Sequence, residues 1–149
     1  MTVQLEGFRE LERALKELPK NTGRNVLRRV GKGALEPLAV KARGMAPVDD
    51  GKLRDAIMVS EKRTKRVARA NRFDRNTGVE ISMGPVSGDG VLNYATFVEF
   101  GTNDTRADPF MRPAWEGGKQ AVLEYIKENL GNEIDKAAKR LAKKALKGI

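Results

Sequence analysis

The chain of 149 residues contains neither cysteine nor histidine. Without cysteine it can form no disulfide, no thiolate nucleophile and no zinc site that needs sulfur ligands. Without histidine it also lacks the usual base of a catalytic triad and the commonest ligand of transition metals. An enzyme would have to work through carboxylates, lysine or tyrosine alone, so we expect no catalytic residues, no cofactor and no metal site.

Long apolar runs and phosphate-binding loops are missing as well. No stretch approaches the roughly 20 apolar residues that a membrane-spanning helix needs, and neither the Walker nor the dinucleotide-binding pattern can be matched. The closest carboxylates, Asp49 and Asp50, precede Gly51 in a turn signal, where bonds to local amides explain both better than a metal does. We therefore expect a cytoplasmic protein with no nucleotide and no membrane partner.

Positive charge is the strongest feature of the composition, with a net charge of +9 and a pI near 10.0. Such a charge attracts nucleic acid, an anionic membrane or an acidic protein partner, and the charge alone does not choose among them. Its densest stretch is expected to form an exposed, mobile loop or hairpin tip over residues 61–76. The residues assigned there to DNA or to an acidic partner are Lys62, Arg63, Lys65, Arg66, Arg69, Arg72 and Arg75.

Hydrophobic periodicity predicts helices at both ends of the chain. Apolar residues recur at spacings of three and four in residues 8–18 and 22–46, and Pro37 is expected to kink or divide the second segment. The same spacing returns in residues 113–147, where glycines are points at which a helix could start late or break. The Lys-rich end of this helix, residues 136–147, suits either solvent or an acidic partner.

Strands are expected between these helices. Residues 79–83 alternate clearly with period two, residues 53–60 are expected to begin the sheet, and residues 2–5 suggest a short opening strand. Residues 94–100 fit either a strand or a few helical turns. The order of elements predicts a single α+β domain over residues 1–149, with a small antiparallel sheet packed against long helices and a long C-terminal helix.

The most specific motif consists of two aromatic segments separated by a polar loop. Its two parts are Tyr94-Ala95-Thr96-Phe97-Val98-Glu99-Phe100-Gly101-Thr102 and Pro109-Phe110-Met111-Arg112-Pro113-Ala114. The side chains expected to pack the end of the last helix onto the sheet are Phe97, Val98, Phe110 and Trp115. Glu99 lies among apolar residues and needs a partner if it is buried. A turn amide or an arginine, from this chain or a neighbour, would serve.

In three blocks the sequence resembles the tail-completion, or head–tail joining, proteins of siphophages, which are minor tail components of the lambdoid-phage type. The blocks are the helix start Gly7-Phe8-Arg9-Glu10-Leu11, the turn Ala46-Pro47-Val48-Asp49-Asp50-Gly51-Lys52-Leu53-Arg54, and the motif of residues 94–102 with 109–114. Asp50 departs from the family pattern, which carries a small hydroxyl residue there, and the basic stretch is longer than in the family.

The resemblance implies a structural virion protein of the tail or neck, assembled in the host cytoplasm. It implies a homo-oligomeric, hexameric ring that joins the tail tube or tail terminator protein to the head connector or stopper protein, with non-specific contact to genome DNA in the lumen. A ring needs two different surfaces on each subunit. The interface residues assigned here are Tyr94, Phe97, Glu99, Phe100, Thr102, Pro109, Phe110 and Arg112.

Two other functions fit parts of the sequence. A sequence-independent DNA-binding protein would act through residues 62–75 and lose affinity steeply with salt. Phe73 is the only aromatic residue there, which gives little support to stacking on unpaired bases. A magnesium-dependent nuclease would have to be built from Asp49, Asp50 and Glu80.

Overall fold

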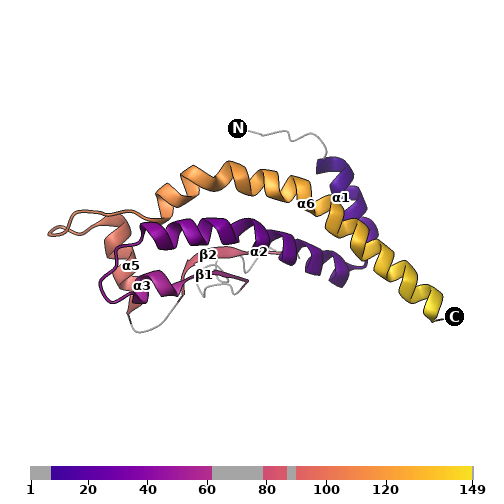
Figure 1. Cartoon of the computed structure of the whole chain (residues 1–149), viewed down its shortest axis with the longest axis horizontal. Helices are drawn as coiled ribbons and strands as arrows, with labels where there is room; N and C mark the ends of the chain where they lie inside the picture. Colours follow the sequence, from indigo (N-terminus) through magenta and orange to yellow (C-terminus); the bar gives the residue numbers. More distant parts are fainter. Residues whose placement is uncertain (1–7, 62–78, 87–89, 149) are drawn as a thin grey trace, which may run out of the picture.

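The computed structural model describes residues 8–61, 79–86 and 90–148 (Figure 1). Its elements in chain order are α1 (Phe8–Glu17), α2 (Lys20–Met45), α3 (Lys52–Ala56), β1 (Ile57–Ser60), β2 (Ser82–Pro85), α5 (Val91–Phe100) and α6 (Met111–Lys147). The predicted α+β class, with a small antiparallel sheet and a long C-terminal helix, is confirmed. The strand predicted at residues 2–5 and the basic stretch at 62–75 lie outside the described residues.

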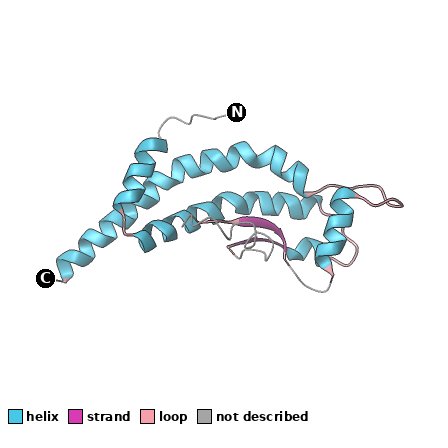
Figure 2. Cartoon of the chain, turned by 180° about the vertical axis from the view of Figure 1, so that it is seen from behind, coloured by secondary structure: helices cyan, strands magenta, loops and turns pink. Residues whose placement is uncertain are grey.

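Two long helices, α2 and α6, lie antiparallel to each other along most of the molecule (Figures 1 and 2). Apolar residues recur at every fourth position of α2, which places them on one face of the helix. The buried side chains along this interface are Val26, Val30, Ala34 and Leu38 of α2 and Val122, Leu130 and Ile134 of α6. Burying each of the larger ones stabilises the fold by about 1.5–3 kcal/mol.

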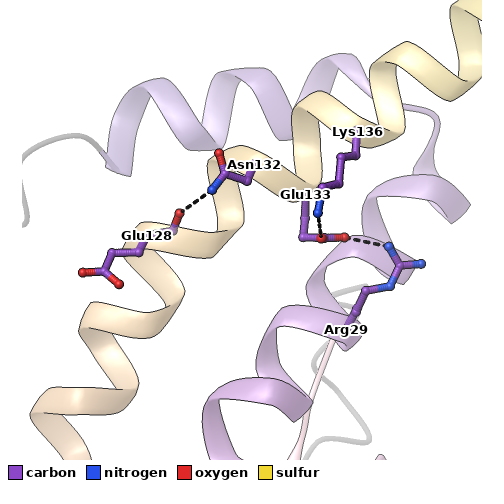
Figure 3. Close-up of polar contacts among 5 residues, drawn as sticks. All are labelled: Arg29, Glu128, Asn132, Glu133 and Lys136. Atoms are coloured by element: carbon purple, nitrogen blue, oxygen red, sulfur yellow. Dashed lines mark hydrogen bonds and ion pairs between the residues drawn. The ribbon is translucent and has the colours of Figure 1, made fainter.

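A polar link adds to this apolar contact at the outer edge of the two helices (Figure 3). Glu133 of α6 accepts from Nη1 of Arg29 on α2 at 2.7 Å and from Nζ of Lys136 at 3.1 Å. Asn132, next to Glu133 in the chain, donates from its side-chain amide to the carbonyl oxygen of Glu128, one turn earlier, at 3.3 Å. The hydrogen bond from Arg29, and after it the one from Lys136, hold the pKa of Glu133 below its usual value.

Neither long helix breaks where the sequence suggested. α2 runs as one helix through Pro37, and Leu38 next to it is buried against α6. α6 begins at Met111, two residues before the predicted start, and contains every glycine of the segment. A Cβ atom at Gly118 would lie 2.8 Å from Cδ1 of Leu38, so this glycine marks close approach of the two helices and not a break.

The sheet has two strands and lies on the side of α2 that faces away from α6 (Figures 1 and 2). The strands are antiparallel, with Ile57 opposite Pro85 and Ser60 opposite Ser82. The sheet is therefore covered by helices on one side, as expected for this class.

The predicted strand boundaries were partly wrong. In residues 53–60, the first half forms α3, because Gly51 adopts a φ of 82° and starts a helical turn that buries Leu53. β2 begins at Ser82, later than predicted, and continues through Gly84 to Pro85, because pairing with β1 decides its extent. Residues 94–100, which fitted two structures, belong to a helix.

Besides the interface between α2 and α6, a second buried core lies where α2, α3, β1, α5 and α6 meet. Its buried members are Ala39, Ala42, Ala46, Leu53, Ile57, Ala95, Phe110 and Ala114. Small residues dominate this set, so the five elements approach closely around the ring of Phe110, which is only 1% exposed. Within residues 8–61, 79–86 and 90–148, no helix combines the length and the apolar character needed to cross a bilayer.

Candidate protein-interaction site

Glu99, near the end of α5, binds the first turn of α6. Its Oε2 accepts from the backbone N–H groups of Phe110 at 2.8 Å and Met111 at 2.9 Å, and its Oε1 accepts from that of Arg112 at 2.9 Å. These amides are among the four at a helix N-terminus that have no partner within the helix. The carboxylate also faces the positive end of the helix dipole. Glu99 is thus the cap of α6, supplied by the preceding helix.

Burial by itself would raise the pKa of Glu99. The hydrogen bonds from the amides of Met111, Phe110 and Arg112, together with the charge of Arg112, outweigh that effect and hold the pKa below its ordinary value of 4.5. The carboxylate is therefore ionised at neutral pH, as a cap of a helix N-terminus should be. Of the partners suggested by the sequence, the turn amides of the same chain are the ones found.

The loop between α5 and α6 is folded by its own hydrogen bonds. Gly101 ends α5 with a φ of 74°. Thr102 then donates its N–H to the carbonyl oxygen of Thr105 at 2.9 Å, and its hydroxyl oxygen accepts from the N–H of Thr105 at 3.0 Å. Asp108 returns to α5 by donating its N–H to the carbonyl oxygen of Val98 at 2.8 Å. Thr102, assigned to an interface from the sequence, thus has a local role in the loop.

Large apolar side chains remain exposed on the outer side of α5. The residues of this surface, called the α5 face below, are Leu92, Tyr94, Phe97 and Phe100, between 43% and 65% exposed. Phe97 and Phe100 lie on the side of the helix opposite the buried Ala95, whereas Tyr94 lies at its flank and Leu92, three residues before Ala95, lies towards the groove described next. An exposed apolar patch of this kind is typical of a protein interaction site.

The α5 face continues into a groove formed by α5, the end of β2 and the start of α6. Pro85, Leu92, Thr96, Phe100 and Arg112 are among its lining residues. The guanidinium carbon of Arg112 lies 5.8 Å from the centre of the Phe100 ring, a cation–π arrangement that adds a charge at the edge of the groove.

The predicted packing of the motif is correct for some residues and wrong for others. Phe110 is buried and Val98 packs against the same core. Phe97 and Trp115 are 53% and 45% exposed, so they do not pack the helix onto the sheet. Because Glu99 and the buried Phe110 hold α5 against α6, the assigned residues that remain on the surface are Tyr94, Phe97, Phe100, Thr102, Pro109 and Arg112.

The acidic residues considered for metal chemistry have other surroundings. Asp50 accepts from the backbone N–H of Lys52 at 3.1 Å and from its Nζ at 3.0 Å, which is the local bonding expected of a turn. Among the residues that the structure describes, no three acidic side chains are grouped so that they could hold a metal ion. The turn therefore accounts for the bonding of Asp50.

One comparison with known proteins finds a match. A family model described as "Bacteriophage HK97-gp10, putative tail-component" matches residues 9–101. This range covers more than half of the chain and includes α1 to α5, and it leaves α6 outside. No curated protein and no solved structure matches the chain.

Proposed function

Because the chain belongs to the HK97-gp10-like family of bacteriophage tail components, we propose that it forms a ring at the head-proximal end of the tail and joins the tail to the head. Its partners in this role are other copies of the chain, a tail tube or terminator protein, and a connector or stopper protein of the head. The ring has six subunits, which matches the symmetry of a tail tube.

The observation that carries this proposal is the α5 face. Phe97 and Phe100 are exposed on a helix that is fixed in place by three hydrogen bonds from α6 to Glu99. A surface that is both apolar and rigid can bind a protein partner with little loss of conformational entropy. Such a surface serves a structural protein, so we propose that the chain has no enzymatic activity.

A joining assay tests the proposal. Tails and DNA-filled heads are prepared from phage that lack this protein, the purified chain is added, and infectious particles are counted. The natural chain is expected to restore infectivity, whereas the variant with Phe97→Ser and Phe100→Ser is expected not to. Val40→Ser is the matched control, because Val40 is an exposed apolar residue of α2, at 59%, outside the α5 face.

The outcome of this assay separates the two main functions considered for the sequence. Failure of the natural chain to restore infectivity, together with salt-sensitive DNA binding that is lost when Lys65, Arg66 and Arg69 are neutralised, would replace the joining function by sequence-independent DNA binding. Equal activity of the double Ser variant and the Val40→Ser control would remove the α5 face from the joining function.

A further inference from the structure

The last turns of α6 extend beyond the rest of the molecule. Residues 138–147, called the C-terminal arm below, form the last turns of α6, and the end of the helix runs past α1 and α2 in both views (Figures 1 and 2). Arg140, Leu141 and Lys144 still line a groove with the start of α2. Every residue of the arm is exposed except Leu141, which is half-buried, and Leu146 is 75% exposed. The arm therefore contributes little to the core of its own chain, although it is a regular continuation of α6.

The arm is strongly amphipathic. Its apolar residues recur at spacings of three and four and fall on one side of the helix, namely Ala138, Leu141, Ala142, Ala145 and Leu146. Its basic residues occupy the opposite side, namely Lys139, Arg140, Lys143, Lys144 and Lys147. The arm contains no carboxylate. A helix with one apolar and one cationic side fits an apolar groove with acidic edges.

A surface of that kind lies at the other end of the molecule. The α5 face is apolar, and α5 itself contains no cation. The loop that follows it carries Asp104 and Asp108, both exposed, against the single cation Arg106. Arg112 beside Phe100 adds a second cation and Glu99 a third carboxylate, so residues 91–112 carry a net charge of −1. The acceptor end is thus apolar with a net negative charge, and the arm is apolar with a net positive charge.

The two surfaces of one chain cannot meet. They are attached to opposite ends of α6, an unbroken helix of 37 residues, and a helix of that length spans about 55 Å along its axis. The arm of one copy can reach only the α5 face of another copy. Because the two surfaces differ, such contacts are heterologous, and each subunit would use one surface of each kind, as a closed ring requires.

We propose that the C-terminal arm of one copy docks on the α5 face of the next copy, with Leu146 and its apolar neighbours against Phe97 and Phe100 and the arm's lysines beside Asp104 and Asp108. The proposal rests on the ring of the proposed function and identifies its subunit contact. DNA would engage the cations of the arm but not its apolar side, and the carboxylates beside α5 would repel phosphate.

Disulfide trapping tests this contact directly, because the natural chain has no cysteine. Two single variants, Leu146→Cys and Phe97→Cys, are purified, mixed and oxidised, and a disulfide-linked pair containing one of each is expected. A disulfide needs the two Cα atoms within about 7 Å, so this pair reports docking and not mere proximity. The control mixes Leu146→Cys with Glu124→Cys, an exposed position in the middle of α6, and should give little product.

Charge exchange tests the chemistry of the contact. Lys143→Glu with Lys147→Glu on the arm partner should lower the yield of the mixed disulfide about tenfold, which corresponds to about 1.4 kcal/mol. Asp104→Lys with Asp108→Lys on the Phe97→Cys partner should restore it. Substituting exposed residues leaves the fold of each variant intact, which circular dichroism can check.

Each result counts for or against the contact. The proposal is overturned if no mixed disulfide forms in purified protein or in assembled tails, if Leu146→Cys links mainly to itself, or if the arm instead binds duplex DNA or anionic vesicles with the same loss on charge reversal. Restored infectivity in the joining assay without the mixed disulfide would leave the proposed function standing and remove this contact. Formation of the mixed disulfide without restored infectivity would support this contact and remove the proposed joining function.

Discussion

At the scale of single residues, Glu99 has the largest structural role in the motif. It joins α5 to α6 across the loop between them. Phe110, at the N-cap position of α6, has no side-chain acceptor, and the carboxylate of Glu99 takes its place. The sequence contained a signal for this role, since an acidic residue among aromatic ones, just before a glycine turn and a second helix, needs a partner of opposite polarity. Periodicity could not identify the partner, because the bond is made to backbone amides.

The lowered pKa of Glu99 predicts a specific acid sensitivity. A carboxylate whose pKa is lower in the folded than in the unfolded chain stabilises the fold above its unfolded pKa, and this contribution is lost as the pH falls through the folded value. We expect Glu99→Gln to lower the free energy of unfolding by about 1–3 kcal/mol at pH 7. The difference between variant and natural chain should shrink as the pH falls below 4.5, the ordinary value for this group.

Urea unfolding of both chains at pH 7 and at several lower values measures this effect. Other carboxylates with lowered pKa values, such as Glu133, affect both chains equally, so the difference isolates Glu99. A difference that is the same at every pH would show that the ionised carboxylate is not what caps α6.

Gly101 is the second residue with an exacting position. It has a φ of 74°, and a Cβ atom there would lie 2.8 Å from the backbone nitrogen of Ala107 and 2.9 Å from the carbonyl oxygen of Thr105. Gly90 has a similar φ of 76°, and a Cβ atom there would have no atom of the described residues within 4 Å. Gly90→Ala should therefore cost only the conformational penalty of about 1–2 kcal/mol, and Gly101→Ala should cost clearly more, because the neighbours are backbone atoms. Thermal unfolding of the two variants makes the comparison, and equal losses would contradict it.

At the scale of elements, the long helices were the most predictable part of the fold. Their apolar residues keep the helical spacing over many turns, so packing and propensity agree on α2 and α6. The short elements were not predictable to the same degree. The segment that became α3 is too short, and the one that became α5 too short and too apolar, for periodicity to separate helix from strand. The extent of β2 depends on its pairing with β1.

The contact between α2 and α6 predicts opposite effects at two adjacent glycines. At Gly118 a Cβ atom would lie 2.8 Å from Cδ1 of Leu38, whereas at Gly117 the nearest atom is the flexible Nζ of Lys41 at 3.5 Å. Gly117→Ala should stabilise the chain by up to about 1 kcal/mol through helix propensity. Gly118→Ala should destabilise it by about 1–2 kcal/mol, because overpacking outweighs the same gain. Chemical unfolding measures both, and stabilisation by Gly118→Ala would mean that the helices are less closely packed.

At the scale of the whole molecule, the two candidate surfaces lie at opposite ends of one helix. The α5 face was anticipated, because residues 94–112 contained the most specific motif of the sequence. The arm was visible only as a Lys-rich tail suited to solvent or to an acidic partner. The sequence alone could not predict the distance between the α5 face and the arm. That distance depends on α6 continuing without a break through its glycines.

Removing part of the arm should abolish assembly and leave the stability of the fold nearly unchanged. A chain that ends at Leu141 keeps the side chain that lines a groove with Val26, and the described residues that it loses, 142–148, are all exposed. Its free energy of unfolding should change by less than about 0.5 kcal/mol, while its activity in the joining assay should be abolished. A truncated chain that joins heads to tails normally would show that the arm is dispensable. One that unfolds readily would show that the arm belongs to the core.

The continuity of α6 has a consequence for how the protein can evolve. Each residue added to an α-helix lengthens it by about 1.5 Å and turns everything beyond it by about 100°. One inserted residue in the middle of α6 would thus aim the arm's apolar side away from its target, whereas seven would restore its direction within about 20° and move it about 10 Å further out. The length of α6 therefore sets both the distance of the arm from the α5 face and the direction of its apolar side. Functional relatives should differ in the length of this helix by whole heptads, and each added heptad should accompany a wider ring.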